Sequence, residues 1–400
     1  MKFDFDRVVD RKSTNDMKWN SKAVESYLHV PIPENIIPMW LADMDVACPP
    51  AVQEAVIERA KKEIYGYCAP TPEFMKAVCY WQKARHNFDV DASWIGDLPS
   101  VVAGINVAIR TLTEEGDGVI IQQPVYDPFE TIVKRSNRTM VNNALICEDG
   151  YYTMDYELLE KQAKDPKNKL MILCSPHNPA GRVWKAEELI KAADICIANG
   201  VKIVVDEIHS DIVFKGHKHY PLMSLKEEYK NEVIMLTSPG KTFNVAGLKM
   251  SISIIANEQI RKAFNETKLA MSLDVRSTFG IESIIHCYKE ENIEWLEQLL
   301  EYIEGNADFV CDYVEKNMPG VKFRKPEGTY LGWLDMSGTN IPDNEIMKDI
   351  ILGTGVICVP GNWFGAGGEG HIRLNMGCPK AMLEDALDRF TKALNEKLNK

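Results

Sequence analysis

Short runs of apolar residues alternate with helical patterns through the middle of the chain, from about residue 100 to residue 256. Between most of these runs, as at 186–198, apolar residues recur every three or four positions. Near-continuous apolar strands are typical of parallel sheets that helices cover on both faces. The pattern therefore predicts an α/β domain with a buried, mostly parallel sheet, whose strands lie at 119–121, 170–173, 201–205, 233–236 and 251–255.

Helical spacing of apolar residues also occurs on both sides of this region. On the N-terminal side it predicts a helix from Pro50 to about residue 64 and another from about residue 71. On the C-terminal side it predicts one long helix over 283–316. A smaller α/β domain is predicted after this helix, with strands at 329–336, 356–359 and 371–375 and helices from Pro342 and Pro379.

The first 48 residues have no strong period and contain Pro31, Pro33 and Pro38. We interpret them as an irregular arm that contributes to the small domain and is anchored by the apolar run around Trp40. The predicted organisation is an arm over 1–48, a large domain over 49–285 and a small C-terminal domain over 286–400.

Composition and charge exclude several classes of protein. The 400 residues are 45% hydrophobic and 26% charged, as in an ordinary globular protein. A net charge of -12 argues against nucleic-acid binding, which needs clustered Lys and Arg. No segment approaches the roughly 20 apolar residues of a membrane span, and the acidic start does not fit a signal peptide, so we expect a cytoplasmic protein. The ten cysteines include no Cys-x-x-Cys pair and predict neither disulfides nor a zinc site.

Lys241 lies in a turn of small residues directly after the apolar run at 233–236. Burying a lysine at the end of a strand is unfavourable unless its charge or its amine has a function. A phosphate-binding P-loop would need a glycine at position 235, which is occupied by Met235. The other function is a Schiff base with a carbonyl cofactor, which predicts an acid, an aromatic ring and phosphate donors elsewhere in the chain.

Polar residues are found where the predicted strands end. Tyr126, Asn178, Asp206, His209 and Lys241 each follow an apolar run. Ligands of open α/β sheets bind beyond the carboxyl ends of the strands. Taken singly, each residue has an ordinary alternative role in a turn, a cap or the core. Found together at the ends of strands, these residues indicate a ligand site much more specifically than any one of them does alone.

Two other motifs are better explained without a ligand. Residues 365–370 match Gly-x-Gly-x-x-Gly, but a predicted strand follows them where a dinucleotide loop needs a helix. We expect a hairpin connection there. His217 and His219 lie near Asp206 and His209, but a lysine separates the first pair and no further ligand spacing fits a metal. We expect a solvated turn at 217–219 and no metal.

Several motifs together resemble a known family: Asn178-Pro179-x-Gly181, Asp206 with His209, Ser238-x-x-Lys241 and Arg373-Leu374-Asn375. This set is similar to the fold-type I pyridoxal-phosphate enzymes, the aspartate aminotransferase superfamily. With residues 39–45, 124–129 and 373–379, the chain resembles the MalY/PatB group of carbon–sulfur β-lyases over nearly its whole length. The resemblance implies a large domain with a mostly parallel seven-stranded sheet, a smaller C-terminal α/β domain and pyridoxal 5'-phosphate as cofactor.

The same resemblance implies roles for the residues at the strand ends. Lys241 forms the Schiff base with the cofactor and then moves the α-proton of the substrate. Asp206 pairs with the pyridine nitrogen, Asn178 bonds the phenolic oxygen, and Tyr126 stacks on the ring. His209 stands where aminotransferases usually carry a tyrosine, which fits the lyase group.

A phosphate site and a substrate site complete the implied set. The N-terminus of a helix beginning near residue 100 offers free N–H groups for phosphate. The residues assigned to it are Ser100, Val101, Val102, Ser238 and Lys249, together with Tyr67, which reaches the neighbouring subunit of a homodimer. Substrate contacts are assigned to Arg373, which binds the α-carboxylate, and to Asn178, Ala42, Asp43 and Tyr330.

Three functions remain open at this point. The leading hypothesis is a lyase that cleaves L-cystathionine or a related cysteine conjugate to pyruvate, ammonia and a thiol. An aminotransferase would use the same residues, so the fold does not separate the two. The third hypothesis is a regulator or binding protein that has inherited a cofactor site.

Overall fold

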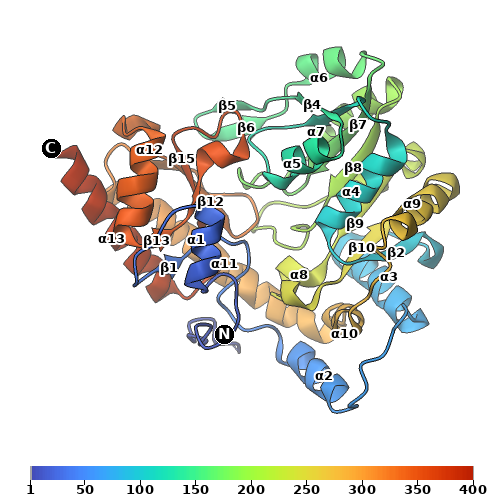
Figure 1. Cartoon of the computed structure of the whole chain (residues 1–400), viewed down its shortest axis with the longest axis horizontal. Helices are drawn as coiled ribbons and strands as arrows, with labels where there is room; N and C mark the ends of the chain where they lie inside the picture. The colour runs from blue at the N-terminus through green and yellow to red at the C-terminus, as the bar shows by residue number, and fades with distance from the viewer. Residues whose placement is uncertain (1, 400) are drawn as a thin grey trace.

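The computed structural model describes residues 2–399, and within them the largest sheet has seven strands in the order β2-β10-β9-β8-β7-β3-β4 (Figure 1). These are β2 (Ile95–Leu98), β3 (Gly118–Ile121), β4 (Thr139–Asn142), β7 (Asn168–Cys174), β8 (Lys202–Asp206), β9 (Val233–Thr237) and β10 (Ser251–Ile254). β10 is antiparallel to both of its neighbours, whereas the other neighbouring strands are parallel. The predicted fold class and the mostly parallel seven-stranded sheet are confirmed.

Alternating side chains along each strand enter two separate hydrophobic cores. In β3, Val119 and Ile121 belong to one core, and Ile120 between them belongs to the other. Because both faces of the sheet are buried, the sequences of these strands are near-continuous apolar runs. The first core is closed by α4 (Val101–Leu112), α5 (Pro128–Arg135) and α9 (Glu258–Ala270), and the second by α3 (Pro72–His86), α6 (Tyr156–Ala163), α7 (Ala186–Ala198) and α10 (Thr278–Cys287).

The hydrophobic pattern of the sequence did not predict several short or exposed elements. β2 and β4 form the edges of the sheet, and β4 has no fully buried residue, so its apolar signal is weak. The small hairpin of β5 (Ile146–Glu148) and β6 (Tyr151–Thr153) was missed for the same reason. The first predicted helix is α2 (Pro50–Ala60), which ends at Ala60 and not near residue 64.

The single long helix predicted over 283–316 is wrong. The structure has two helices here, α10 and α11 (Ile293–Asn317), separated by a 3-10 turn (Glu290–Asn292). The side-chain amide of Asn292 donates to the carbonyl of His286 at 2.7 Å and so satisfies an acceptor at the end of α10. The apolar period continues through the break because both helices bury one face in the same core.

A four-stranded antiparallel sheet organises the C-terminal region (Figure 1, left). Its order is β11-β12-β15-β14, with β11 (Lys322–Phe323), β12 (Leu331–Asp335), β14 (Val359–Pro360) and β15 (His371–Asn375). The helical elements are α12 (Asp343–Glu345), a π-helix (Ile346–Leu352) and α13 (Lys380–Leu398). Residues 365–370 lead into β15, a strand, as expected for the glycine-rich segment.

The N-terminal arm is more regular than predicted. It contains α1 (Ser21–Leu28), whose first turn is capped by the Asn20 side chain accepting from the N–H of Ala23. Its strand β1 (Ile37–Pro38) pairs in parallel with β13 (Val356–Ile357) of the C-terminal region. This pairing places the arm against the C-terminal sheet, while the three domain boundaries stay a prediction.

His219 corrects the prediction of a solvated turn at 217–219. His217 is exposed, but His219 is buried, and its Nε2 lies 3.0 Å from Oε2 of buried Glu207. In the part of the chain that the structure describes, no group of three or more His, Cys, Asp or Glu could hold a metal ion. No helix among residues 2–399 is long and apolar enough to cross a membrane.

Candidate active site

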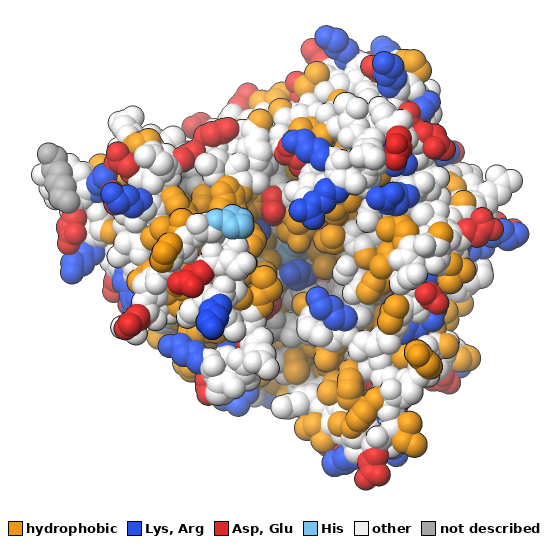
Figure 2. Space-filling model, viewed as in Figure 1, with side chains coloured by type: hydrophobic (Ala, Val, Ile, Leu, Met, Phe, Trp, Pro, Cys, Tyr) orange, Lys and Arg blue, Asp and Glu red, His pale blue; other side chains and the backbone are white. Residues whose placement is uncertain are grey.

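A cavity of about 400 Å³ lies at the carboxyl ends of β7, β8 and β9 and beneath the N-terminal arm. Figure 2 shows the recess between the two halves of the molecule, with basic side chains around it. The predicted site residues that line the cavity are Lys241, Asp206, Asn178, Tyr126, His209, Ser238, Ser100, Val101, Val102, Lys249, Arg373 and Ala42. Tyr67, Asp43 and Tyr330 are not among its lining residues.

Lys241 is presented by α8 (Pro239–Thr242), a single turn that starts directly after β9. Ser238 is the N-cap of this turn and accepts a hydrogen bond from the N–H of Gly240, and Pro239 sets the first helical position. Burial lowers the pKa of the Lys241 amine to about 8. About a tenth of the amine is therefore neutral at pH 7, far more than for an ordinary lysine, and the neutral form is what a nucleophile or a base requires.

Asp211 anchors the turn that carries Lys241. This buried carboxylate accepts from Thr242 Oγ1 at 2.8 Å and from Trp81 Nε1 at 3.0 Å, and it lies 3.0 Å from His86 Nε2. Thr242 belongs to α8, whereas Trp81 and His86 belong to α3, so one carboxylate ties the Lys241 turn to the wall of the large domain. The sequence analysis missed this role, because nothing in the spacing of the four residues brings them together.

Asp206 is the last residue of β8 and lies beside Cys174 of β7. It is 4% exposed, and within residues 2–399 its carboxylate accepts a single hydrogen bond, from the N–H of Ile208 at 3.0 Å. Burial raises the pKa of the Asp206 carboxyl to about 7. A buried carboxyl with a free oxygen on the cavity needs a cationic or protonated partner, which a pyridinium nitrogen supplies.

Asn178, Tyr126 and His209 surround the space above Asp206. The N–H of Tyr126 donates to the carbonyl of Asn178 at 3.1 Å, which fixes the two loops to each other. His209 is buried, and its Nδ1 has no hydrogen-bond partner within residues 2–399. Burial, with the positive charges of Lys241 and Arg373, lowers the pKa of His209 to about 3. His209 is therefore a neutral ring at the site.

Arg373 is a buried cation that forms no ion pair with any residue the structure describes. Its Nη1 donates to Asn178 Oδ1 at 3.2 Å and its Nη2 to the carbonyl of Trp40 at 2.7 Å, while Nε is unsatisfied. A buried guanidinium without an anion is unfavourable. The arrangement fits a ligand that brings a carboxylate into the cavity.

An anion-binding cradle forms another part of the cavity lining. Val101 and Val102 begin α4, so their N–H groups have no partner within the helix, and the Ser100 side chain caps the N–H of Ala103. Lys249 lines the same end. The hydroxyl of Ser238 also reaches the cavity, but it donates to the carbonyl of Met250 at 2.8 Å.

The arm supplies the roof of the cavity through the carbonyl of Ala42. This carbonyl accepts hydrogen bonds from Lys241 Nζ and from the hydroxyl of Tyr330, the latter at 2.8 Å. Tyr330 stands behind the wall, with its ring 5.8 Å from that of His209. It supports the roof and His209, and it does not line the cavity.

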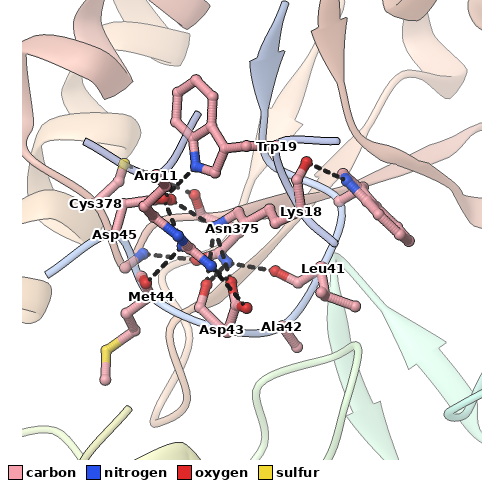
Figure 3. Close-up of polar contacts among 12 residues, drawn as sticks. Arg11, Lys18, Trp19, Leu41, Ala42, Asp43, Met44, Asp45, Asn375 and Cys378 are labelled. Carbon is pink, nitrogen blue, oxygen red and sulfur yellow. Dashed lines mark hydrogen bonds and ion pairs between the residues drawn. The ribbon is translucent and has the colours of Figure 1, made fainter. Parts of the chain in front are cut away.

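Charged side chains hold the arm in this place (Figure 3). Arg11 bonds the carboxylates of Asp43 and Asp45, and Lys18 Nζ lies 2.5 Å from Asp45 Oδ2. The carbonyl of Asp43 accepts from Lys18 Nζ at 2.8 Å and from Asn375 Nδ2 at 2.6 Å. Asp43 therefore faces this network and not the cavity. Nothing in the sequence marked Arg11 and Lys18 as more than two basic residues near acidic ones.

These features fit pyridoxal phosphate, the cofactor that the motifs imply. With this cofactor bound, Lys241 would hold the aldehyde, the free oxygen of Asp206 would face the pyridine nitrogen, and Asn178 would face the phenolic oxygen. The N-terminus of α4 suits the phosphate. Nδ1 of His209 and Nε of Arg373 are buried without a hydrogen-bond partner in the described chain, and both residues line the same cavity. These two atoms can therefore bond to a group bound there.

Comparison with known proteins agrees with the geometry. The family model described as "Aminotransferase class I and II" matches residues 36–390. The chain belongs to this family. It is 38% identical to "Cystathionine beta-lyase PatB" of Bacillus subtilis (strain 168), over 98% of this chain and 100% of PatB. It is 32% identical to "Protein MalY" of Escherichia coli (strain K12), over 98% of this chain and 99% of MalY.

A solved structure gives the same result. Cystalysin from Treponema denticola, whose crystal structure contains pyridoxal 5'-phosphate, superposes with a TM-score of 0.95 at 36% identity. The match covers 99% of this chain and 100% of cystalysin. The predicted family is confirmed.

Proposed function

We propose that the protein is a pyridoxal-phosphate-dependent carbon–sulfur β-lyase that cleaves L-cystathionine or related S-substituted L-cysteines to pyruvate, ammonia and a thiol. The observation that carries this proposal is one cavity holding the Lys241 amine, buried Asp206 and the unpaired guanidinium of Arg373. The choice of a lyase over an aminotransferase is supported by the name of PatB, a cystathionine beta-lyase.

Each residue has a task that its surroundings explain. When bound, the cofactor withdraws electrons from the α-carbon of an amino acid and makes its proton acidic. Arg373 holds the substrate α-carboxylate through its fork of N–H groups. The Lys241 amine, with its pKa lowered to about 8, takes the α-proton. Asp206 holds a proton at the pyridine nitrogen, and the thiolate then leaves from the β-carbon with the electrons of the carbon–sulfur bond.

A product assay with L-cystathionine as sole substrate tests this function. We expect pyruvate, ammonia and homocysteine in equal amounts over many turnovers without any added 2-oxoacid. Elimination needs no second substrate because the leaving thiolate takes the electrons. A single turnover that stops until 2-oxoglutarate is added would show an aminotransferase instead. The Lys241→Ala variant, loaded with cofactor, is the control for pyruvate released without the enzyme.

The active form is proposed to be a homodimer in which Tyr67 reaches the phosphate of the neighbouring subunit. Tyr67 is fully exposed, and Ile57, Ile64 and Tyr65 are exposed beside it in the sequence. Figure 2 shows hydrophobic side chains gathered over α2 at the lower end of the molecule. Exposed apolar patches of this kind favour association.

Hybrid dimers test the shared site. Lys241→Ala and Tyr67→Phe dimers should each have little activity, whereas reassociated mixtures contain hybrids with one intact site. An equal mixture should regain about a quarter of the wild-type activity. If mass spectrometry shows that hybrid dimers have formed and no activity returns, Tyr67 does not contribute to the neighbouring site.

The cytoplasmic location predicted from the sequence is also proposed here, and ten free cysteines suit a reducing compartment.

A further inference from the structure

The cavity opens into an outer hollow at its mouth, and two residues line both spaces. The outer hollow, of about 850 Å³, lies over α1 and the end of α5, and Tyr27 and Asp127 are shared between it and the inner cavity. Arg373 and Lys241 lie on the inner side, so a substrate held by them extends its side chain outward. The part of the substrate beyond its sulfur therefore passes between Tyr27 and Asp127.

Aromatic rings form one wall of this passage. The ring of Tyr27 packs on Trp40 with centroids 4.3 Å apart and meets the edge of Trp363 at 5.3 Å. These rings can cover the methylene groups of a thioether, but they do not distinguish one end group from another. Selectivity for the end group has to come from a polar residue at the same place.

Asp127 is the acidic residue at this passage, and no described basic side chain forms an ion pair with it. It is half-buried, and apart from its own backbone N–H and the charge of Arg373 its carboxylate has no hydrogen-bond or ion-pair partner among residues 2–399. Although it stands at the N-cap of α5, its side chain makes no capping bond. Burial raises the pKa of Asp127, and Arg373 opposes that shift. A carboxylate kept partly out of water with no cation in direct contact has a strong preference for one.

We propose that Asp127 selects substrates whose leaving thiol carries a positive charge, such as the ammonium of an amino-acid or aminoalkyl thiol. The inference rests on the proposed lyase function and adds a substrate class to it. An ammonium at the far end of the thioether pairs with Asp127, whereas a carboxylate there is repelled. Arg135, exposed and without an ion pair in the described chain, lines the outer hollow and can meet a carboxylate beyond Asp127.

Three substrates with the same three-carbon spacer on sulfur test the proposal. They are S-propyl-, S-(3-aminopropyl)- and S-(3-carboxypropyl)-L-cysteine, whose spacers end in a hydrogen, an ammonium and a carboxylate. At pH 8 we expect kcat/KM of the wild type for the aminopropyl conjugate to exceed that for the carboxypropyl conjugate by about tenfold or more. In Asp127→Asn this ratio should fall to within about threefold of one, while the propyl conjugate is almost unaffected.

Two controls make the outcome decisive. Glu130→Gln removes an equal charge from α5 at a residue that lines neither space, and it should keep the wild-type ratio. Binding of the three conjugates to cofactor-loaded Lys241→Ala, followed by absorbance, should show the same preference without turnover. A ratio unchanged in Asp127→Asn, or an equal loss for all three conjugates, would overturn the proposal.

The binding experiment also separates this proposal from the lyase function. If no conjugate yields pyruvate, the lyase function is wrong. The order of the three dissociation constants still shows whether Asp127 distinguishes a positive from a negative end group. If pyruvate forms but the charge preference is absent, only the role of Asp127 fails.

Discussion

The floor and the roof of the cavity are held in place by different forces. The floor consists of Asp206 and the Lys241 turn, which follow strands whose side chains are buried on both faces. The roof is the carbonyl of Ala42, on an arm fixed by Arg11 and Lys18 against two aspartates. The floor therefore depends mainly on apolar packing, with Asp211 anchoring the Lys241 turn, and the roof depends on buried ion pairs.

This difference determines what a substitution does in each region. Apolar strands tolerate conservative changes at modest cost, because the hydrophobic effect has no direction. A buried ion pair that loses one partner leaves the other charge without compensation, at a cost of about 3–5 kcal/mol. Changes to the floor should alter the chemistry while the arm stays in place, and changes to the roof should release the arm.

The largest expected effect belongs to the floor. Lys241→Ala should lower kcat by about a thousandfold or more, because it removes the base that moves the α-proton. The melting temperature of the variant should stay close to that of the wild type. Borohydride reduction of the wild type, followed by peptide mass analysis, should find the cofactor attached to Lys241. Attachment to another lysine would contradict the assignment.

The next effect separates chemistry from binding at the same floor. Asp206→Asn should lower kcat by about a hundredfold or more while changing KM little, because the proton at the pyridine nitrogen matters chiefly once the α-carbon carries negative charge. Steady-state kinetics with L-cystathionine give both constants. A raised KM with an unchanged kcat would mean that Asp206 only binds the cofactor.

The same contrast explains what could be predicted from the sequence. Lys241, Asp206 and Asn178 follow apolar runs, and parallel topology brings such strand ends to one edge of a sheet, so their proximity was predictable. Arg11, Lys18 and Asn375 meet only through the packing of the arm, and no periodicity encodes that. Asp211 and His86 were missed because their bond crosses from α3 to the segment after β8.

The third effect breaks the roof. Lys18→Met should lower the free energy of unfolding by about 3 kcal/mol, because buried Asp45 loses one of its two cationic partners and keeps only Arg11. KM should rise as Ala42 loses its position. Limited proteolysis should cut within the arm faster than in the wild type. Lys22→Met changes an exposed lysine of the same arm and is the matched control. Equal proteolysis of both variants would mean that the ion pair does not retain the arm.

The smallest expected effect is on the pH dependence of stability in the cofactor-free protein, which differs between the floor and the roof. Burial raises the pKa of Asp206 from 3.8 to about 7, so the folded state binds a proton that the unfolded state has lost. Stability due to this group is complete below pH 4 and is lost as the pH rises through 7, by about 2–4 kcal/mol. Lys241, with a pKa of about 8, is mostly protonated in this window and adds little slope.

Asp45 of the roof has the opposite sign. Burial alone raises its pKa, but Lys18 and Arg11 lower it below the ordinary value, so its contribution is present at neutral pH and is lost in acid. Denaturant unfolding of wild type and Asp206→Asn at pH 5 and pH 8 isolates the floor. The variant should gain stability relative to the wild type on going to pH 8, because its amide does not ionise. An unchanged difference between the two proteins would show that Asp206 is ionised in both conditions, stabilised by a partner other than the cofactor.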